Sequence, residues 1–368
     1  MVEKDFEMTK KLAAIGRQFM IPGDIYAFSV IKRGNINATF KVTFKQEDES
    51  IETYIFQRIN TFVFKSPVEI MENIELVTSF IEKKSVGKPS LKFRHTKDGK
   101  NYCYDDESSF WRVMNYIDSV TFDLSDDPYI IASTGEAFGQ FVMLLSELDG
   151  SKLHETIPDF HNTGKRLDTL FKHEALAPEE VLDECRNELR YIHDVGHKAR
   201  KLSDKFLKGK LPVRVTHNDT KCNNVLFDKD TKRPLVVIDL DTVMPGMAMY
   251  DFGDAVRFIA NSCHEDEPDV RKVFFDTSKF RAFCKGYLGQ VKGILTKEEI
   301  DSLVLATFSI TIELAARFLD DYILGDVYFK IDYPGHNLVR TRCQLALAKD
   351  IMRKFDELTR IVEESVNM

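Results

Sequence analysis

The feature that most constrains this chain is a polar loop, residues 217–224 (HNDTKCNN), that lies between two apolar segments. The loop sets Asp219 and Asn224 five residues apart. The residues after it predict a short strand over 225–227, a turn over 228–234 and a buried strand over 235–238. The second strand ends directly before Asp239. The order of these segments therefore predicts a hairpin with Asp219 and Asn224 before its first strand and Asp239 after its second.

An acid and an amide at this spacing are typical of the loop that transfers a phosphoryl group in kinase-like folds. There the acid orients or deprotonates the attacking hydroxyl, and the amide oxygen holds a Mg²⁺ ion that bridges the nucleotide phosphates. We therefore expect Asp219 to be catalytic and Asn224 and Asp239 to be Mg²⁺ ligands. The alternative is a plain solvated hairpin, because such pairs also arise by chance. The order in which the three residues follow one another favours the catalytic interpretation.

A second motif, Asp251-Phe252-Gly253, spells the metal-binding motif of protein kinases. Asp251 follows residues 247–250, which do not read as a buried strand, whereas Asp239 ends one. We therefore expect Asp251 to support the catalytic loop by hydrogen bonding and not to bind the metal.

Composition excludes several classes of protein. The chain has 368 residues, 43% hydrophobic and 30% charged, which is typical of a globular protein of two domains or one bilobal unit. Its net charge of −8 and the lack of a long basic block argue against a nucleic acid or an anionic membrane as partner. The six cysteines are scattered without CxxC spacing, so neither a zinc site nor a disulfide framework is indicated.

The N-terminus and the apolar tracts bear on location. Residues 1–18 carry acidic residues among the apolar ones and lack the pattern of a signal peptide. The longest apolar tract, residues 303–312, is too short to span a membrane. These features predict a cytoplasmic protein with free thiols and with no evident obligate protein partner.

The two parts of the chain differ in pattern. The N-terminal part predicts a helix that starts at Ser66-Pro67 and five strands, over 25–32, 38–45, 52–59, 91–95 and 101–104. The remainder is mostly helical, with starts at a capping box, Ser133–Glu136, and at Pro178, and helices over 277–287, 297–324 and 337–366. The fold class is therefore α+β, as in a bilobal protein-kinase-like fold: a small β-rich lobe over 1–117 and a larger helical lobe over 118–368.

The segment from Gly34 to Phe40 joins two strands and predicts a turn that offers backbone N–H groups to phosphates, although an ordinary hairpin turn has the same pattern. The next strand carries Gln57 where a kinase has its phosphate-binding lysine. Arg58 could supply the missing charge, or Mg²⁺ and backbone donors could carry more of it. Glu72 is a candidate partner for a cation there, or an ordinary exposed helical residue.

The segment from Val215 to Asp254 resembles the aminoglycoside phosphotransferase and choline kinase superfamily, and within it the N-acetylhexosamine 1-kinase group. The resemblance implies ATP and Mg²⁺ as cofactors, with adenine near Tyr116 and the triphosphate between the lobes. The residues expected to bind nucleotide are Gly34, Asn35, Ile36, Asn37, Thr39, Gln57, Tyr116 and Ile117.

The same resemblance implies a sugar acceptor. The anomeric hydroxyl of N-acetylglucosamine or N-acetylgalactosamine would be converted to the α-1-phosphate. Asp219, Asp239, Arg317 and Tyr328 stand at positions that match the sugar-contacting residues of that group. An arginine fork and a tyrosine hydroxyl suit a neutral polyhydroxyl ligand.

Two other interpretations stay open. One is a kinase of the same mechanism with another small hydroxylated acceptor, such as an aminoglycoside, choline or homoserine. Choline would favour an aromatic cage, and the single tryptophan, Trp111, lies in the small lobe. The other is a non-catalytic nucleotide-binding scaffold, which only the missing lysine suggests.

Overall fold

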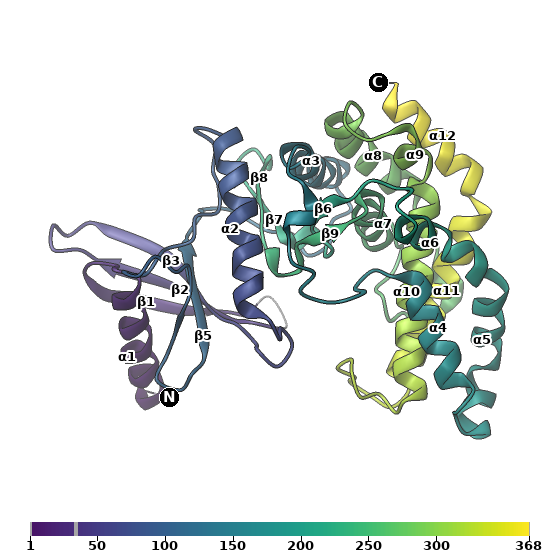
Figure 1. The fold of residues 1–368 in the computed structure, drawn as a ribbon, viewed down its shortest axis with the longest axis horizontal. Coiled ribbons are helices and arrows are strands. Elements are labelled where there is room, and N and C mark those ends of the chain that lie inside the picture. Colours follow the sequence, from purple (N-terminus) through teal and green to yellow (C-terminus); the bar gives the residue numbers. More distant parts are fainter. Residues whose placement is uncertain (1, 33–35, 368) are drawn as a thin grey trace. The chain divides into compact units, whose positions relative to one another are not determined.

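The computed structural model of the chain describes residues 2–32 and 36–367 (Figure 1). The chain forms two compact units. The first comprises Met1–Ser119, Leu153–Ile157 and Ile238–Val243, and the second comprises Val120–Lys152, Pro158–Val237 and Met244–Met368. A sheet dominates the first unit and helices dominate the second, which confirms the predicted α+β fold class.

The sheet of the first unit has five antiparallel strands in the order β1-β2-β3-β5-β4; β1, β2, β3 and β5 are labelled in Figure 1. The bounds are β1 (Asp24–Ile31), β2 (Ala38–Lys45), β3 (Ile51–Arg58), β4 (Cys103–Tyr104) and β5 (Phe110–Asn115). The first three agree with the predicted strands to within one residue. Buried residues alternate with less buried ones along β2 and β3, whereas β1 has no buried residue.

One face of this sheet packs on an N-terminal helix, α1 (Val2–Gln18), which the sequence analysis did not predict. Leu12 and Ile15 of α1 lie against Phe40 and Phe56 of the strands in a single apolar cluster. The opposite face carries polar side chains and adjoins α2 (Pro67–Lys84), which begins at the proline as predicted.

Asn73 of α2 joins two distant segments to the first unit. Its Nδ2 donates to the carbonyl oxygens of His154 (2.9 Å) and Val243 (3.0 Å). Asn73 is buried, so both bonds are shielded from water. The segments Leu153–Ile157 and Ile238–Val243 therefore belong to this unit although they lie far along the chain.

The predicted strand over 91–95 is wrong. Only Phe93 forms an isolated bridge, to Met114 of β5. The missing strand is β5 itself, whose residues 110–114 are all buried. A strand buried on both faces shows no alternation of apolar and polar residues, and this is why the pattern did not reveal it. The turn around Asp98-Gly99 is confirmed, with Gly99 at φ +80°.

The second unit is built mainly from ten helices of the described chain. These are α3 (Pro128–Leu144), α4 (Thr163–Glu174), α5 (Glu179–Ala199), α6 (Lys201–Leu207), α7 (Ala248–Ile259), α8 (Thr277–Val291), α9 (Lys297–Asp301), α10 (Leu303–Ile323), α11 (His336–Arg353) and α12 (Phe355–Val366). The predicted helices near the C-terminus are confirmed, except that the last two break at Ser302 and Lys354. Across the described residues, no helix has the length and apolarity needed to cross a membrane.

The predicted helix start at Ser133 is wrong. α3 begins at Pro128, and the side chain of Asp127 caps it by accepting a hydrogen bond from the backbone N–H of Tyr129 (2.8 Å). Thr134 instead lies inside the helix and donates to the carbonyl oxygen of Ile130 (2.9 Å). An acid followed by proline is itself a helix-start signal, and here it precedes the capping box in the chain.

Helices α3 and α8 pack backbone to backbone across glycines (Figure 1). A Cβ on Gly286 would lie 1.9 Å from the carbonyl oxygen of Ala132, and one on Gly135 would lie 2.4 Å from that of Phe283. Since the obstructing atoms belong to the backbone, no side-chain movement could relieve either clash.

We expect Gly286→Ala to lower the free energy of unfolding by about 3 kcal/mol, because α3 and α8 would have to move apart. Gly289→Ala is the matched control in the same helix, since nothing lies within 4 Å of its added Cβ. The control should be neutral or stabilise by up to about 1 kcal/mol through helix propensity. Chemical denaturation measures both variants, and equal stabilities would contradict the close packing.

Candidate active site

Two small sheets hold the ends of the predicted catalytic loop. β6 (Arg214–Thr216), before the loop, pairs with β9 (Met244–Gly246). β7 (Val225–Phe227), after the loop, pairs with β8 (Pro234–Val237), which confirms the predicted hairpin. Gly246 suits its place because a Cβ there would lie 2.3 Å from Oγ1 of Thr216. The loop therefore starts and ends on fixed strands.

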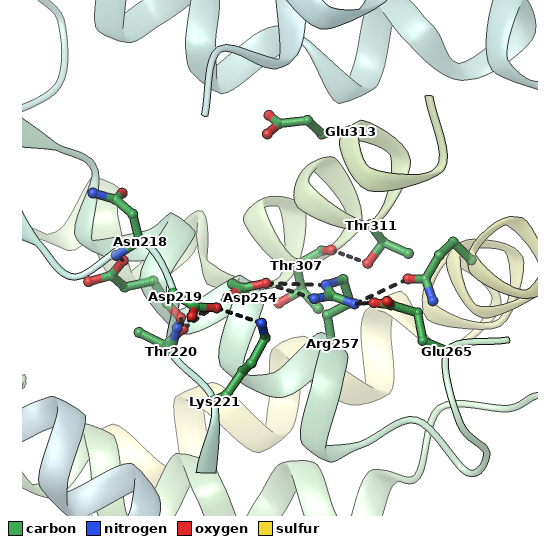
Figure 2. Close-up of polar contacts among 12 residues, drawn as sticks. Asn218, Asp219, Thr220, Lys221, Asp254, Arg257, Glu265, Thr307, Thr311 and Glu313 are labelled. Carbon is green, nitrogen blue, oxygen red and sulfur yellow. Dashed lines mark hydrogen bonds and ion pairs between the residues drawn. The ribbon is translucent and has the colours of Figure 1, made fainter. Parts of the chain in front are cut away.

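Asp219 and Asn224 come together within the second unit, as the sequence predicts. Nδ2 of Asn224 donates to the backbone oxygen of Asp219 (2.9 Å) and to its Oδ2 (3.2 Å). The other carboxylate oxygen of Asp219 forms an ion pair with Nζ of Lys221 at 2.8 Å (Figure 2). The Asp219 side chain keeps 31% exposure, so it is held in place and still open to solvent.

Lys221 is a residue that the sequence analysis did not select. Burial works against its charge, but Asp219, and beyond it Asp254 and Glu265, raise the pKa of Lys221 above its ordinary value. The lysine therefore stays protonated beside the carboxylate. The signal in the sequence is its position two residues after Asp219 in the same loop.

Asn224 is suited to hold Mg²⁺. Its Nδ2 is engaged by Asp219, and its Oδ1 accepts no hydrogen bond from any residue in the described chain. A free amide oxygen is a ligand that Mg²⁺ prefers. Asp239 lies in Ile238–Val243 of the first unit, so the structure does not group it with Asn224 in one unit. Over residues 2–32 and 36–367, no three His, Cys, Asp or Glu side chains cluster in a way that could hold a metal.

Asp251 supports the catalytic loop, as predicted. Its two carboxylate oxygens accept the backbone N–H groups of His217 (2.7 Å) and Asn218 (2.8 Å). Both oxygens are engaged and the residue is buried, as expected for a residue that supports the loop. Burial raises the pKa of Asp251 to about 6, against the opposing effect of His217 and of these hydrogen bonds.

A second acid, Asp254, lies three residues further along α7, on the same helix face as Asp251. It accepts the backbone N–H of Thr220 (3.2 Å) and pairs with Arg257 (2.9 Å), which in turn pairs with Glu265 (2.8 Å; Figure 2). Burial opposes its charge, but Arg257 keeps the pKa of Asp254 below the ordinary value. The sequence analysis missed it, although the i, i+3 spacing of two acids was visible.

A partly buried histidine, His161, also contacts the loop. Nδ1 of His161 lies 2.9 Å from Oε1 of Glu313, and Nε2 lies 3.2 Å from the carbonyl oxygen of Asn218. Both neighbours are acceptors, so the imidazolium with two N–H donors satisfies them. Burial alone would lower the pKa of His161, but the pairing with Glu313 raises it. Thr163 adds a third contact, 2.7 Å from the other Glu313 oxygen.

Arg317, predicted to contact the sugar, lies one helical turn after Glu313 on α10. Its guanidinium lies over the rings of Phe160 (5.7 Å) and Phe329 (5.5 Å). Arg166 is nearby: burial, and then the charge of Arg317, lower its pKa, and its Nε has no hydrogen-bond partner in the described part of the chain. Two guanidinium groups and aromatic rings thus share one region of the second unit.

Tyr328, the other predicted sugar contact, is 70% exposed. Its ring packs against Phe329, and its backbone N–H donates to Oδ1 of Asp321 (2.7 Å). The structure places Tyr328 beside the same aromatic ring that Arg317 covers. The two predicted sugar contacts therefore lie in the same region, which Arg166 also adjoins.

The predicted nucleotide residues lie in the first unit. Gly34 and Asn35 fall outside the described residues. Ile36 is exposed, and Asn37, Thr39 and Gln57 join one hydrogen-bonded network on the polar face of the sheet. Tyr116 and Ile117 directly follow the last residue of β5.

The charged residues near Gln57 in the sequence or in space differ in burial and in partners. Arg58 is exposed at the end of β3, whereas Arg112 of β5 is 2% exposed and its Nε donates to Oε1 of Gln57 (2.9 Å). Glu72 pairs with His154 (2.8 Å) on the surface and not with a cation beside Gln57. The sequence analysis missed Arg112, because a lone arginine in an apolar strand carries no local signal.

Cys222, inside the loop, behaves as a buried spacer. Burial raises the pKa of its thiol to about 11, and its Sγ lies 3.3 Å from Oγ1 of Thr134. A thiol with a raised pKa is a poor nucleophile at neutral pH.

Because the pKa of Asp251 is raised in the folded protein, the free energy of unfolding should depend on pH. The folded protein holds this proton up to about pH 6, and the unfolded chain releases it near 3.8. Stability from Asp251 is therefore present at low pH and lost as the pH rises through this window. Relative to Asp251→Asn, wild type should lose about 2 kcal/mol of unfolding free energy between pH 4.5 and pH 7. Denaturation of both proteins at several pH values measures this, and a pH-independent difference would contradict the shift.

Comparison with known proteins places this site in a family. The model of the phosphotransferase enzyme family (APH) matches residues 28–286, which include the loop, Asp239 and Asp251, whereas Arg317 and Tyr328 lie beyond the match.

Three solved structures share the fold. An aminoglycoside phosphotransferase from Alicyclobacillus acidocaldarius is 13% identical, with 96% of each chain covered and a TM-score of 0.59. Choline kinase from Cryptosporidium parvum is 14% identical, with 90% of each chain covered and a TM-score of 0.51. The aminoglycoside phosphotransferase APH(2'')-Ib with ADP bound is 15% identical, with 93% of this chain and 98% of that chain covered and a TM-score of 0.53. Since the family model spans well over half of its length, this chain belongs to the phosphotransferase enzyme family.

Proposed function

We propose that this phosphotransferase is an ATP-dependent kinase that converts N-acetylglucosamine or N-acetylgalactosamine to the α-1-phosphate. Asp219 orients the anomeric hydroxyl towards the γ-phosphoryl group. Asn224 and Asp239 hold the Mg²⁺ ion that neutralises the phosphates, and the turn around Asn37, with Tyr116, receives the nucleotide. ADP in a solved structure of the same fold supports ATP as the donor.

The geometry of Asp219 carries the proposal. Its carboxylate is oriented by Lys221 and Asn224, and its backbone is fixed through Asn218 by Asp251 and His161. A hydroxyl that approaches Asp219 would meet an acceptor already in position, and such positioning is the main means by which proteins accelerate phosphoryl transfer.

The metal assignment rests on the donor types and the order of the chain. Asn224 lies directly before β7, and its amide oxygen accepts no hydrogen bond within residues 2–32 and 36–367; Asp239 follows β8 by two residues. Amide and carboxylate oxygens are the ligands Mg²⁺ takes in nucleotide sites, and the ion would bridge the phosphates.

The charge near Arg317 favours a sugar over a cationic acceptor. Arg166 and Arg317 bring two positive charges to a region that also holds Phe160, Phe329 and Tyr328, while the nearby carboxylate of Glu313 pairs with His161. An ammonium group, quaternary in choline or protonated in aminoglycosides, would be repelled there. A neutral N-acetyl sugar can accept hydrogen bonds from guanidinium N–H groups and lay its apolar face on an aromatic ring.

A second candidate is a kinase of the same mechanism that phosphorylates another small alcohol. The names of the solved structures favour it, since they include aminoglycoside, choline and aminopropanol kinases. A non-catalytic scaffold is less well supported, because Asp219, Asn224 and Asp239 are all present. We place the protein in the cytoplasm, with small molecules as its only required partners and no role for nucleic acid or a membrane.

Asp219→Asn should lower kcat with N-acetylhexosamine by at least about 10²-fold without changing stability, because it removes the charged acceptor. Asp230→Asn, an exposed acid in the β7–β8 turn, is the control and should keep wild-type activity. An ADP-release assay across N-acetylhexosamines, aminoglycosides, choline and homoserine measures turnover, and ³¹P NMR locates the phosphate. Turnover by Asp219→Asn at the wild-type rate would refute the role of the acid, and a preferred cationic acceptor would refute the sugar.

Arg317→Met should raise KM for the sugar about tenfold and leave KM for ATP unchanged, because one charge-assisted hydrogen bond is lost. Arg186→Met, an exposed arginine of α5, is the control and should leave both constants unchanged. An unchanged sugar KM in Arg317→Met would exclude Arg317 from the acceptor site.

A further inference from the structure

A row of three polar side chains crosses the sheet of the first unit. Thr39 of β2, Gln57 of β3 and Arg112 of β5 are register partners on neighbouring strands, so they lie on one face. Nε2 of Gln57 donates to Oγ1 of Thr39 (3.1 Å), and Nε of Arg112 donates to Oε1 of Gln57 (2.9 Å). The amide of Gln57 thus uses its donor and its acceptor to link two neighbours, and it orients the arginine.

Arg112 also contacts a segment far along the chain, residues 238–243. Its Nη1 forms an ion pair with Oδ1 of Asp241, and the two side chains are 2% and 3% exposed. The second Asp241 oxygen accepts from Nδ2 of Asn37 (2.6 Å), whose own Oδ1 accepts the backbone N–H of Asn60 (2.9 Å). These acceptors are engaged, and the side chains of Thr39, Arg112 and Asp241 are buried.

Asp241 stands two residues after Asp239 in a short, strained segment. Asp239 has φ 62° and ψ 58°, a left-handed conformation that costs free energy in any residue except glycine. A 3-10 turn, Leu240–Thr242, follows directly, and Asn73 holds the carbonyl oxygen of Val243 (3.0 Å). The pair of Arg112 and Asp241 therefore anchors the segment two residues after its left-handed residue.

We propose that Arg112 is a positioning residue for the metal ligand Asp239, acting through Asp241, and that it is the buried cation of the site in which Gln57 replaces the usual lysine. This inference rests on the proposed function, which makes Asp239 a Mg²⁺ ligand. On this view, the site does not lack a positive charge because Gln57 stands where other kinases have a lysine. Gln57 is the neutral side chain that can accept a hydrogen bond from Arg112 where a lysine would repel it.

Stability alone does not account for the pair. A buried ion pair gives little net stability, because two apolar residues of similar volume can replace it without loss, whereas the removal of one partner leaves an unpaired buried charge. The planar guanidinium also makes two directed contacts at once, to Gln57 and to Asp241, which fixes the direction of both neighbours.

The test measures metal binding and not turnover. Mn²⁺ is titrated by electron paramagnetic resonance into the full chain with saturating ADP. We expect Arg112→Met to weaken Mn²⁺ binding about 10- to 100-fold, the range for loss of a residue that orients a metal ligand. Arg112→Lys should recover only part of this, because lysine keeps the charge but not the two-pronged geometry. ADP affinity without metal should stay within about twofold of wild type.

Two further variants separate the possible outcomes. Arg58→Met, the same change at the exposed neighbouring arginine, should leave Mn²⁺ binding unchanged; weakened binding there, with Arg112→Met unaffected, would overturn the inference. Should Arg112→Met unfold, the double variant Arg112→Met/Asp241→Leu removes the unpaired charge and should fold while still binding Mn²⁺ weakly. Wild-type Mn²⁺ affinity in that double variant would also overturn the inference.

Asp239→Asn distinguishes this inference from the proposed function on which it rests. Loss of Mn²⁺ affinity in Asp239→Asn, combined with wild-type affinity in Arg112→Met, would reject the positioning role alone. Wild-type affinity in Asp239→Asn would instead reject Asp239 as a metal ligand and with it the proposed metal site.

Discussion

The carboxylate of Asp251 accepts the backbone N–H groups of His217 and Asn218, and the direction of the next side chain, Asp219, depends on that contact. Asn218 has φ 64°, a left-handed conformation that asparagine tolerates better than most residues. Asp251 holds this peptide from one side and His161, through the carbonyl oxygen of Asn218, from the other. These contacts offset the free energy cost of the strained turn. Under the proposed function, an acceptor hydroxyl would meet an acid that is already oriented.

The first unit repeats this design with different residues. Asp239 is also left-handed, and a buried carboxylate two residues away, Asp241, is anchored by Arg112 and Asn37. In both units, then, a left-handed residue lies at or beside an acid to which we assign a role in the proposed function. A buried carboxylate accepts the backbone N–H of Asn218 in the second unit, and a buried carboxylate follows Asp239 by two residues in the first. The shared principle is that a precise side-chain direction requires a backbone which the local sequence would not adopt by itself.

The acceptor region that we propose holds two arginines, Arg166 and Arg317. Arg166 and Arg317 lie close enough for the charge of Arg317 to lower the pKa of Arg166. Such a pair is compatible with a neutral, oxygen-rich ligand and disfavours an ammonium group. Both arginines lie on helices of the second unit, α4 and α10, and not in the loop that carries Asp219.

The sequence alone determined the residues of the catalytic loop, the hairpin after it, the first three strands and the supporting role of Asp251, because spacing and alternation act between near neighbours in the chain. It did not reveal β5, which is buried on both faces, or the contacts of His161 with Glu313 and of Arg112 with Asp241. Only the tertiary structure decided these, since partners more than a hundred residues apart meet through the packing of helices and strands. The role of a buried charged residue can be inferred once its partner is known, and no local sequence pattern identifies that partner.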